Sequence, residues 1–338
     1  MTMGLLIILI LVLFLPFTVA KVERNLEIFL FAMGICAAIV SGMMDLPLLT
    51  KALTDPIKIA VAVLIAGLLT KWLHDQIGKS IVFLSNKLSP RLFAGLTVIF
   101  LGLASSLITA IIAAIILVII VNVLPLNRQS RVRFTILACF SIGLGAALTP
   151  IGEPLSTITV GKLNEDFTYL FHLIGVEVIV ALLAFGLLTV FMINPRKNSK
   201  GLDVDQKPES YRQIIVRSVK IYLFVMGLTF LGTGFEPLIS TYLLDLHPTI
   251  LYWINMISAV LDNATLAAAE ISPEMSADTI QAILLGLLIS GGMLIPGNIP
   301  NIIAAGKLNI SSKEWAEFAI PVGLNTMAIF FLILFVVY

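Results

Sequence analysis

The chain has 338 residues, of which 59% are hydrophobic and only 12% are charged. Soluble domains carry roughly 25% charged residues, so this composition excludes an ordinary soluble protein and predicts an all-α polytopic membrane protein. The 21 Lys and Arg residues balance 20 Asp and Glu residues, which leaves no basic surface for nucleic acid. The three histidines share no zinc-ligand spacing.

Hydrophobic segments long enough to cross roughly 30 Å of hydrocarbon occur along the whole chain. They lie at 3–20, 27–45, 57–73, 134–160, 169–193, 217–235, 278–305 and 315–338. Two further segments fit a single span poorly: 91–125 is too long, and 249–271 carries Asp262 and Asn263 near its middle. We therefore predict that each is a re-entrant hairpin, a helix pair that enters and leaves the membrane on the same side.

The distribution of positive charge orients these segments. Residues 194–220 carry seven Lys and Arg residues and are expected to be cytoplasmic. With both hairpins re-entrant, 18 of the 21 Lys and Arg residues then lie on the cytoplasmic side. If either hairpin crossed the membrane, every later loop would lie on the opposite side, and the excess of Lys and Arg on the cytoplasmic side would be lost. We therefore expect a multi-pass protein of the cell (inner or plasma) membrane with its N- and C-termini outside.

Two segments of the chain resemble one another. Residues 152–164 (GEPLSTITVGKLN) and 297–309 (GNIPNIIAAGKLN) are identical at six of thirteen positions, and each follows a predicted hairpin. In the orientation above, Lys162 lies outside and Lys307 inside, so the two halves form an inverted repeat. Inverted repeats with broken helices are typical of secondary transporters, whose site lies at the midplane. Coincidence in Ala-, Gly- and Ile-rich sequence is the alternative.

This repeat divides the chain into four parts. We assign N-terminal scaffold helices to 1–56, the first inverted repeat to 57–193, a cytoplasmic linker to 194–216 and the second inverted repeat to 217–338. Each repeat holds one re-entrant hairpin and one broken transmembrane helix. The hairpins are predicted at 91–125 and 249–271, and the broken helices at 134–163 and 278–306.

The first candidate site is the segment TPIGEP, residues 149–154, inside a predicted span. Two prolines and a glycine interrupt a helix there, and lipid offers no partner for the freed backbone groups. Glu153 lies in this break, with Thr149, Ser156 and Thr157 nearby. A carboxylate at such depth costs roughly 2.5–3.5 kcal/mol, which favours a functional role. The alternative is a structural cap of the half-helix that follows.

The second half has a matching break at PGNIPN, residues 296–301, with Asn298 aligned to Glu153 and Asn301 to Ser156. Amide and carbonyl oxygens are ligands that a hard cation such as Na⁺ prefers. The alternative is that both asparagines only satisfy a loop.

The hairpin tips differ between the two halves. Asp262 and Asn263 form the second tip, whereas the first tip carries Thr109, with Ser106 one turn before it. This asymmetry predicts an ion site served by one hairpin carboxylate, the alternative being an ordinary helix cap by Asp262. The candidate Na⁺ ligands are Asp262, Asn263, Glu153 and Asn298.

Here the sequence resembles a known family. The tip SAVLDNATLAAA (258–269) and the break TPIGEP followed by Ser and Thr resemble NhaD-type sodium/proton antiporters of the ion transporter superfamily. The resemblance covers roughly 57–338 and implies an elevator-like transport domain on a homodimeric scaffold. The chain is short for that superfamily, and its first hairpin lacks an acidic or Ser-Asn-Thr tip, which argues against a dicarboxylate substrate.

We therefore expect a secondary active transporter, a sodium (cation)/proton antiporter that works by alternating access. A buried carboxyl group can hold either a proton or Na⁺, because burial disfavours its charged form. The expected partners are membrane lipid and a small cation; Na⁺ and H⁺ are cargo, and no cofactor is expected. An anion transporter of the arsenite or organic-anion type is the alternative, but no Lys or Arg lies at midplane depth. An enzyme is not expected, because no deep His pair or Ser/His constellation is present.

Overall fold

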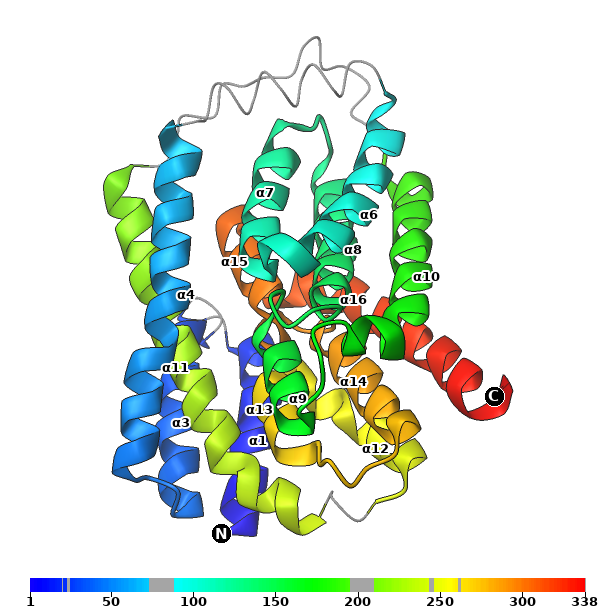
Figure 1. The fold of residues 1–338 in the computed structure, drawn as a ribbon. Helices are drawn as coiled ribbons and strands as arrows, with labels where there is room; N and C mark the ends of the chain where they lie inside the picture. The colour runs from blue at the N-terminus through cyan, green and yellow to red at the C-terminus, as the bar shows by residue number, and fades with distance from the viewer. Residues whose placement is uncertain are drawn as a thin grey trace.

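The computed structural model of the chain describes residues 1–19, 21–22, 25–72, 88–194, 210–242, 246–260 and 263–337. These residues form helices and no strand (Figure 1). Four described helices are long and apolar enough to cross a membrane: Pro90–Ile108, Tyr169–Met192, Tyr211–Leu238 and Ser312–Phe335. The last three of these helices each contain most of one span predicted from the sequence, at 169–193, 217–235 and 315–338. Pro90–Ile108 corresponds to the first arm of the predicted hairpin at 91–125. The all-helical character predicted from composition is thus confirmed, and the long apolar helices are compatible with the predicted multi-pass membrane protein.

One group of helices combines the N-terminal segment with a helix from the second half of the chain. It contains α1 (Thr2–Thr18), α3 (Leu26–Ser41), α4 (Leu46–Trp72) and α11 (Tyr211–Tyr242). Helix α11 packs against both α3 and α4, and α1 packs on α3. We name these four helices the scaffold group. The predicted boundary at residue 56 lies inside α4, which continues through Pro56.

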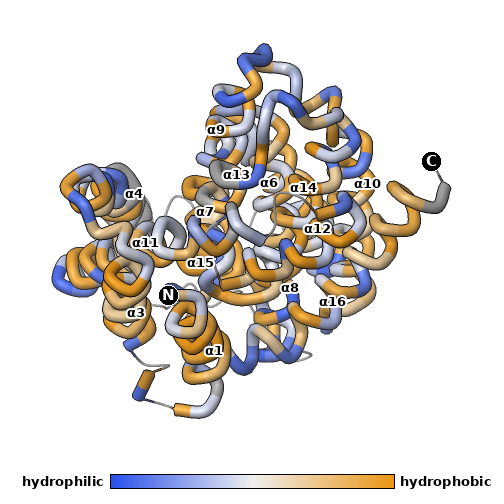
Figure 2. Tube along the Cα trace, turned by 90° about the horizontal axis from the view of Figure 1, so that it is seen from below, coloured by the Kyte–Doolittle hydropathy of each residue, from blue (hydrophilic) through white to orange (hydrophobic). Residues whose placement is uncertain are grey.

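Helices α3 and α11 approach one another closely because glycines face each other. A Cβ atom on Gly34 would lie 2.5 Å from the carbonyl oxygen of Gly227, so a larger residue has no room at this crossing. The ring of Phe31 packs beside that of Phe230, with 6.2 Å between the centroids. Seen from below, the scaffold group lies to one side of the other helices, and α1 is hydrophobic along most of its length (Figure 2).

The remaining helices form what we name the core group. In chain order these are α6 (Pro90–Ile108), α7 (Ala110–Val123), α8 (Arg128–Ala146), α9 (Pro154–Leu163), α10 (Tyr169–Met192), α12 (Pro248–Ile254), η1 (Asn255–Ala259), α13 (Asn263–Glu270), α14 (Ala277–Gly291), η2 (Ile295–Gly297), α15 (Ile299–Leu308), α16 (Ser312–Leu332) and η3 (Ile333–Val337). We call the end of the molecule where α4 ends and α11 begins the upper end, as in Figure 1, and the end where α1 begins and α11 ends the lower end.

The broken helix of the first half begins earlier than predicted. We expected a start at residue 134, whereas α8 starts at Arg128. The reason is a local cap: the side chain of Asn127 accepts a hydrogen bond of 2.8 Å from the backbone N–H of Ser130. Hydropathy alone does not detect this turn, because it contains polar and basic residues.

Helices α6 and α8 are joined by glycines and serine hydroxyl groups. The hydroxyl of Ser105 donates to the carbonyl oxygen of Ile142 at 2.9 Å, and that of Ser141 donates to Val98 at 2.8 Å. Near these bonds, the backbones of Gly102 and Gly145 are in contact. The two polar bonds and the glycine contact together fix the position of α6 along α8.

This contact predicts a large difference between two glycine substitutions. Gly145→Ala should destabilise the protein by about 1–3 kcal/mol or prevent its folding, because the new Cβ atom would overlap the backbone of Gly102. Gly161→Ala is the matched control, since nothing lies within 4 Å of a Cβ atom there. Thermal unfolding in detergent measures the effect, and equal melting temperatures for the two variants would contradict the packing described here.

A single arginine joins the two halves of the chain near the upper end. Arg128, at the start of α8, donates to both carboxylate oxygens of Glu314 at 2.9 and 2.7 Å. It also donates to the carbonyl oxygens of Leu308 and Asn309, at 3.1 and 2.7 Å. The guanidinium group therefore caps the end of α15 while it pairs with the first turn of α16, a geometry that Lys does not reproduce.

Replacing this arginine should weaken the protein more than the loss of an ordinary surface ion pair. Arg128→Gln and Arg128→Lys should both lower the melting temperature, because both leave carbonyl groups at the end of α15 without their donor. Lys313→Gln is the control, because the exposed Lys313–Glu317 pair, 3.9 Å apart, is worth at most about 0.5 kcal/mol. If Arg128→Lys had the melting temperature of the wild type, the positive charge alone, and not the hydrogen bonds of the guanidinium group, would account for the contribution of Arg128 to stability.

Candidate functional site

The first break lies between α8 and α9, at residues 147–153, about midway between the ends of the molecule (Figure 1). It contains the predicted interruption at 149–154 and begins two residues earlier. Its polar side chains bond to the backbone that the break frees. Ser156 donates to the carbonyl oxygen of Ala147 at 3.2 Å, and Thr157 donates to that of Pro150 at 2.6 Å. These two residues therefore hold the unwound segment in shape.

The tip between α6 and α7 lies against this break. Thr109 takes a positive φ of 73° between the two helices. The hydroxyl of Thr149 donates to the carbonyl oxygen of Ser106, and the backbone N–H of Ala110 donates to Gly152 at 3.0 Å. The structure thus brings together Ser106, Thr109 and Thr149, three of the predicted site residues.

Glu153 is the residue immediately before α9. Its backbone is extended, with φ −154° and ψ 160°, and its side chain makes no capping hydrogen bond to its own helix. The residue is only 8% exposed. The carboxyl group is therefore buried at the break without serving as the helix cap that we considered as its alternative role.

The second break lies between α14 and α15, at residues 292–298. The side-chain amide of Asn301, which is fully buried, donates to the carbonyl oxygens of Gly291 and Leu294 at 2.9 and 3.0 Å. Asn298 lies directly before α15, and its amide contacts Gly143 on α8. Asn301 thus stabilises the break, whereas Asn298 connects it to the first half of the chain.

Asn263, the first residue of α13, also reaches the second break. Its amide atoms lie 2.6 and 2.8 Å from the position that a Cβ atom of Gly291 would take. The residue is 5% exposed, and among the described residues its side-chain nitrogen and oxygen have no hydrogen-bond partner. Asp262, predicted beside it, lies outside the described residues, as does most of the predicted linker at 194–216. A buried amide in this condition is available for a ligand or water.

The half-helices after the two breaks match in detail. Both α9 and α15 have ten residues, and both carry a proline in their first two positions. Asn298 precedes α15 with φ −152° and ψ 144°, close to the angles of Glu153. Asn164 and Asn309 end the two helices in the left-handed conformation, with φ 54° and 50°. The aligned GKLN segments therefore adopt the same local structure.

Each half-helix packs on a helix from the other half of the chain. Helix α9 packs against α13, and α15 packs against α7. All four begin near the middle of the molecule, α7 and α15 running towards the upper end and α9 and α13 towards the lower end (Figure 1). Four helix N-termini therefore meet near the two breaks. Their partial positive charges favour an ionised carboxylate such as that of Glu153.

One buried polar pair is not predicted by any motif in the sequence. Asn255 and Glu270 are each 1% exposed, although the sequence marks neither as part of a break or a tip. The available signal was an amide within the apolar segment PTILYWINMIS, residues 248–258.

The fold and the breaks define a class: an all-helical protein with several membrane-length helices and two interrupted helices whose breaks are lined by polar side chains. Within it, the chain belongs to the family described as protein of unknown function (DUF1646), which matches residues 2–337. No curated protein matches the chain.

Proposed function

We propose that this protein is a secondary active transporter that exchanges a small cation, Na⁺ in the first instance, for protons. The two breaks and the two hairpin tips form its binding region, and Glu153 is its central carboxylate. The single observation that carries the proposal is the burial of Glu153 at an interrupted helix, where four helix N-termini meet. A buried carboxyl group in such a place can alternate between a proton and a cation.

An inverted repeat is supported by the packing of the two halves. In the first half, the first hairpin arm α6 packs on α8; in the second half, the corresponding arm, α12 and η1, packs on α14. The second hairpin arms also correspond, because α7 packs on α15 and α13 packs on α9. These two arms each contact one scaffold helix, α7 contacting α4 and α13 contacting α11. Exchanging the halves therefore exchanges the contacts, which is the pattern expected of alternating access around a fixed site.

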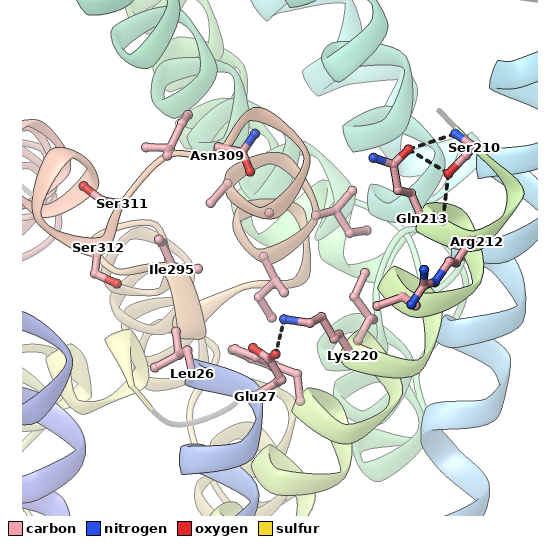
Figure 3. Close-up of a pocket in the computed structure, with 18 residues that line it drawn as sticks. Leu26, Glu27, Ser210, Arg212, Gln213, Lys220, Ile295, Asn309, Ser311 and Ser312 are labelled. Atoms are coloured by element: carbon pink, nitrogen blue, oxygen red, sulfur yellow. Dashed lines mark hydrogen bonds and ion pairs between the residues drawn. The ribbon is translucent and has the colours of Figure 1, made fainter. Parts of the chain in front are cut away.

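A cavity supports access from the upper end. It has a volume of about 930 Å³ and lies between the scaffold group and α15. Its lining extends from Ser210 and Arg212 on the scaffold side to Ile295 in the second break. Figure 3 shows Lys220 of α11 paired with Glu27 of α3 in the scaffold-side wall. The ion pair is 2.5 Å long. We assign the upper end to the cytoplasm, so this cavity would be the cytoplasmic entrance to the site.

The experiment that tests the proposal is transport in proteoliposomes. The purified protein is reconstituted with a pH-sensitive dye inside, and an outward or inward Na⁺ gradient is imposed at zero membrane potential. We expect protons to move in the direction opposite to the flow of Na⁺, and we expect no such proton movement in empty liposomes. Choline in place of Na⁺ is the control, while Li⁺ and K⁺ define the range of cations. Absence of proton movement with all three cations would reject the proposal.

An anion transporter is the second candidate, and one observation favours it. Four helix N-termini at one place form a suitable environment for a small anion. In that case Glu153 would repel the substrate, and Glu153→Gln should preserve or increase uptake of an oxyanion such as arsenite. In the antiporter the same substitution should remove activity, so one variant separates the two candidates.

The inverted topology can be tested by labelling. In a variant without Cys36, we expect Gln129→Cys to react with a membrane-impermeant maleimide from the cytoplasmic side and Glu274→Cys from the opposite side. Both residues are exposed, and they follow the first and second hairpins respectively. Because Cys139 is buried, it should give little background. Labelling of both positions from the same side would exclude the inverted repeat.

A further inference from the structure

A polar pair in the second hairpin is separate from the breaks and the tips. Glu270 is the last residue of α13, and Asn255 is the first residue of η1, so the pair lies between the two arms of this hairpin. The amide of Asn255 is close enough to interact with the carboxyl group of Glu270. Among the described residues, however, neither carboxyl oxygen and neither amide atom has a partner with hydrogen-bond geometry.

The surroundings of the pair are closely packed. The backbone oxygen of Asn255 accepts a hydrogen bond of 2.8 Å from Ser290 on α14. A Cβ atom on Gly286 would lie 3.4 Å from that of Asn255, so α14 covers this side. Helix α13 also packs on α9 and α11. An ionised carboxylate in such a place would be strongly destabilising without a cation or several donors.

Among the described residues, no charged group on these packed elements forms a hydrogen bond with the carboxyl group of Glu270. Lys162, at the end of α9, donates to the carbonyl oxygen of Ile271 at 3.1 Å. Glu236 on α11 and Asp278 in the first turn of α14 are exposed at the protein surface. His247 lies before α12 and bonds with Thr249. The ammonium group of Lys162 is thus bonded to the backbone of Ile271, the residue after Glu270.

The fold does not require polar residues at these positions. Aligning residues 101–116 of the first hairpin with 255–270 of the second places Leu101 at the position of Asn255 and Ile116 at that of Glu270. The first hairpin carries apolar side chains at both of these positions. A polar pair that the other half of the protein replaces with apolar residues points to a role other than packing.

We propose that Glu270 and Asn255 form a proton-binding site, in which the protonated carboxyl group of Glu270 donates a hydrogen bond to the side-chain oxygen of Asn255. The proton moves from the carboxyl group to water when α13 separates from η1 and α14, and it returns by the reverse step. This proposal rests on the proposed function and adds a second carboxyl group to it: Glu270 carries a proton, while the carboxyl group of Glu153, in the region of Asn263, holds a cation or a proton in turn.

Infrared spectroscopy tests the protonation state without any transport. At neutral pH, the spectrum of the wild-type protein minus that of Glu270→Gln should show the carbonyl stretch of a protonated carboxylic acid. In Asn255→Leu the band should persist but move to higher frequency, because its hydrogen bond is lost. Glu177→Gln is the matched control: Glu177 is only half-buried and accepts a hydrogen bond of 3.0 Å from Gln281, so the band should remain. A spectrum unchanged by Glu270→Gln would overturn the proposal.

Transport separates this proposal from the proposed function. Glu270→Gln should keep its Na⁺-dependent thermal stabilisation, which reports binding, while Na⁺-driven proton movement falls to the level of empty liposomes. Wild-type proton movement in Glu270→Gln would reject the proton site and leave the antiporter intact. If the wild type exchanges no cation for protons, the antiporter is rejected, and the infrared band still decides whether Glu270 is protonated.

Discussion

Replacing Glu153 by Gln is expected to reduce Na⁺-driven proton movement to the level of empty liposomes while the protein remains folded. Glutamine has nearly the same volume as glutamate, but it neither releases a proton nor neutralises a cation. The side chain makes no cap to α9, so the half-helix should survive the substitution. Thermal stability should be unchanged or higher, because a carboxyl group in the membrane interior is costly.

Two companion variants make this result specific. Asp262→Asn, at the predicted hairpin tip, should have the same effect on exchange if the cation is bound by both carboxyl groups. Glu177→Gln should retain exchange, since Glu177 lies in the uninterrupted helix α10. Full exchange by Glu153→Gln with normal cation affinity would remove this carboxyl group from the mechanism.

The second large effect is expected at Asn301. Asn301→Leu should destabilise the protein by about 2–4 kcal/mol, because two buried carbonyl groups, those of Gly291 and Leu294, lose their donor. The second break would then lose its shape, and transport should be lost as well. Thermal unfolding in detergent, followed by reconstitution of whatever protein remains folded, measures both effects.

The first half of the chain supplies the control for this substitution. Ser156 occupies the aligned position, but its hydroxyl group serves a single carbonyl oxygen, that of Ala147, at 3.2 Å. Ser156→Ala should therefore cost about 1 kcal/mol or less and should leave transport measurable. Equal losses at the two positions would show that the number of backbone bonds does not determine the stability of a break.

Much of the fold could be predicted because it follows from simple local rules. Proline and glycine interrupt a helix wherever they occur, so TPIGEP and PGNIPN located both breaks, although the first begins at residue 147 rather than 149. The repeated GKLN predicted two equivalent half-helices, and both end at an asparagine with positive φ. These features depend on a few neighbouring residues, which the sequence displays directly.

Other features depend on which helices meet, and no local pattern contains that information. Sequence alignment placed Asn301 opposite Ser156 without indicating that the amide would bond to two carbonyl groups. The sequence places Glu270 in neither a break nor a hairpin tip, whereas the structure buries both Glu270 and Asn255. The start of α4 at Leu46, eleven residues before the predicted span, was missed because the added turns contain charged and polar residues.

The packing of α9 on α13 and of α15 on α7 has a consequence for biogenesis. When the ribosome has completed residue 194, α7 and α9 are already synthesised, but the helices that cover them, α15 and α13, are not. The first half must therefore wait in the membrane with polar break residues uncovered until residues 263–308 arrive. Expressing the halves as separate chains should yield a stable first half only when the second is produced in the same cell, and an insertase or chaperone that shields interrupted helices would act during this interval.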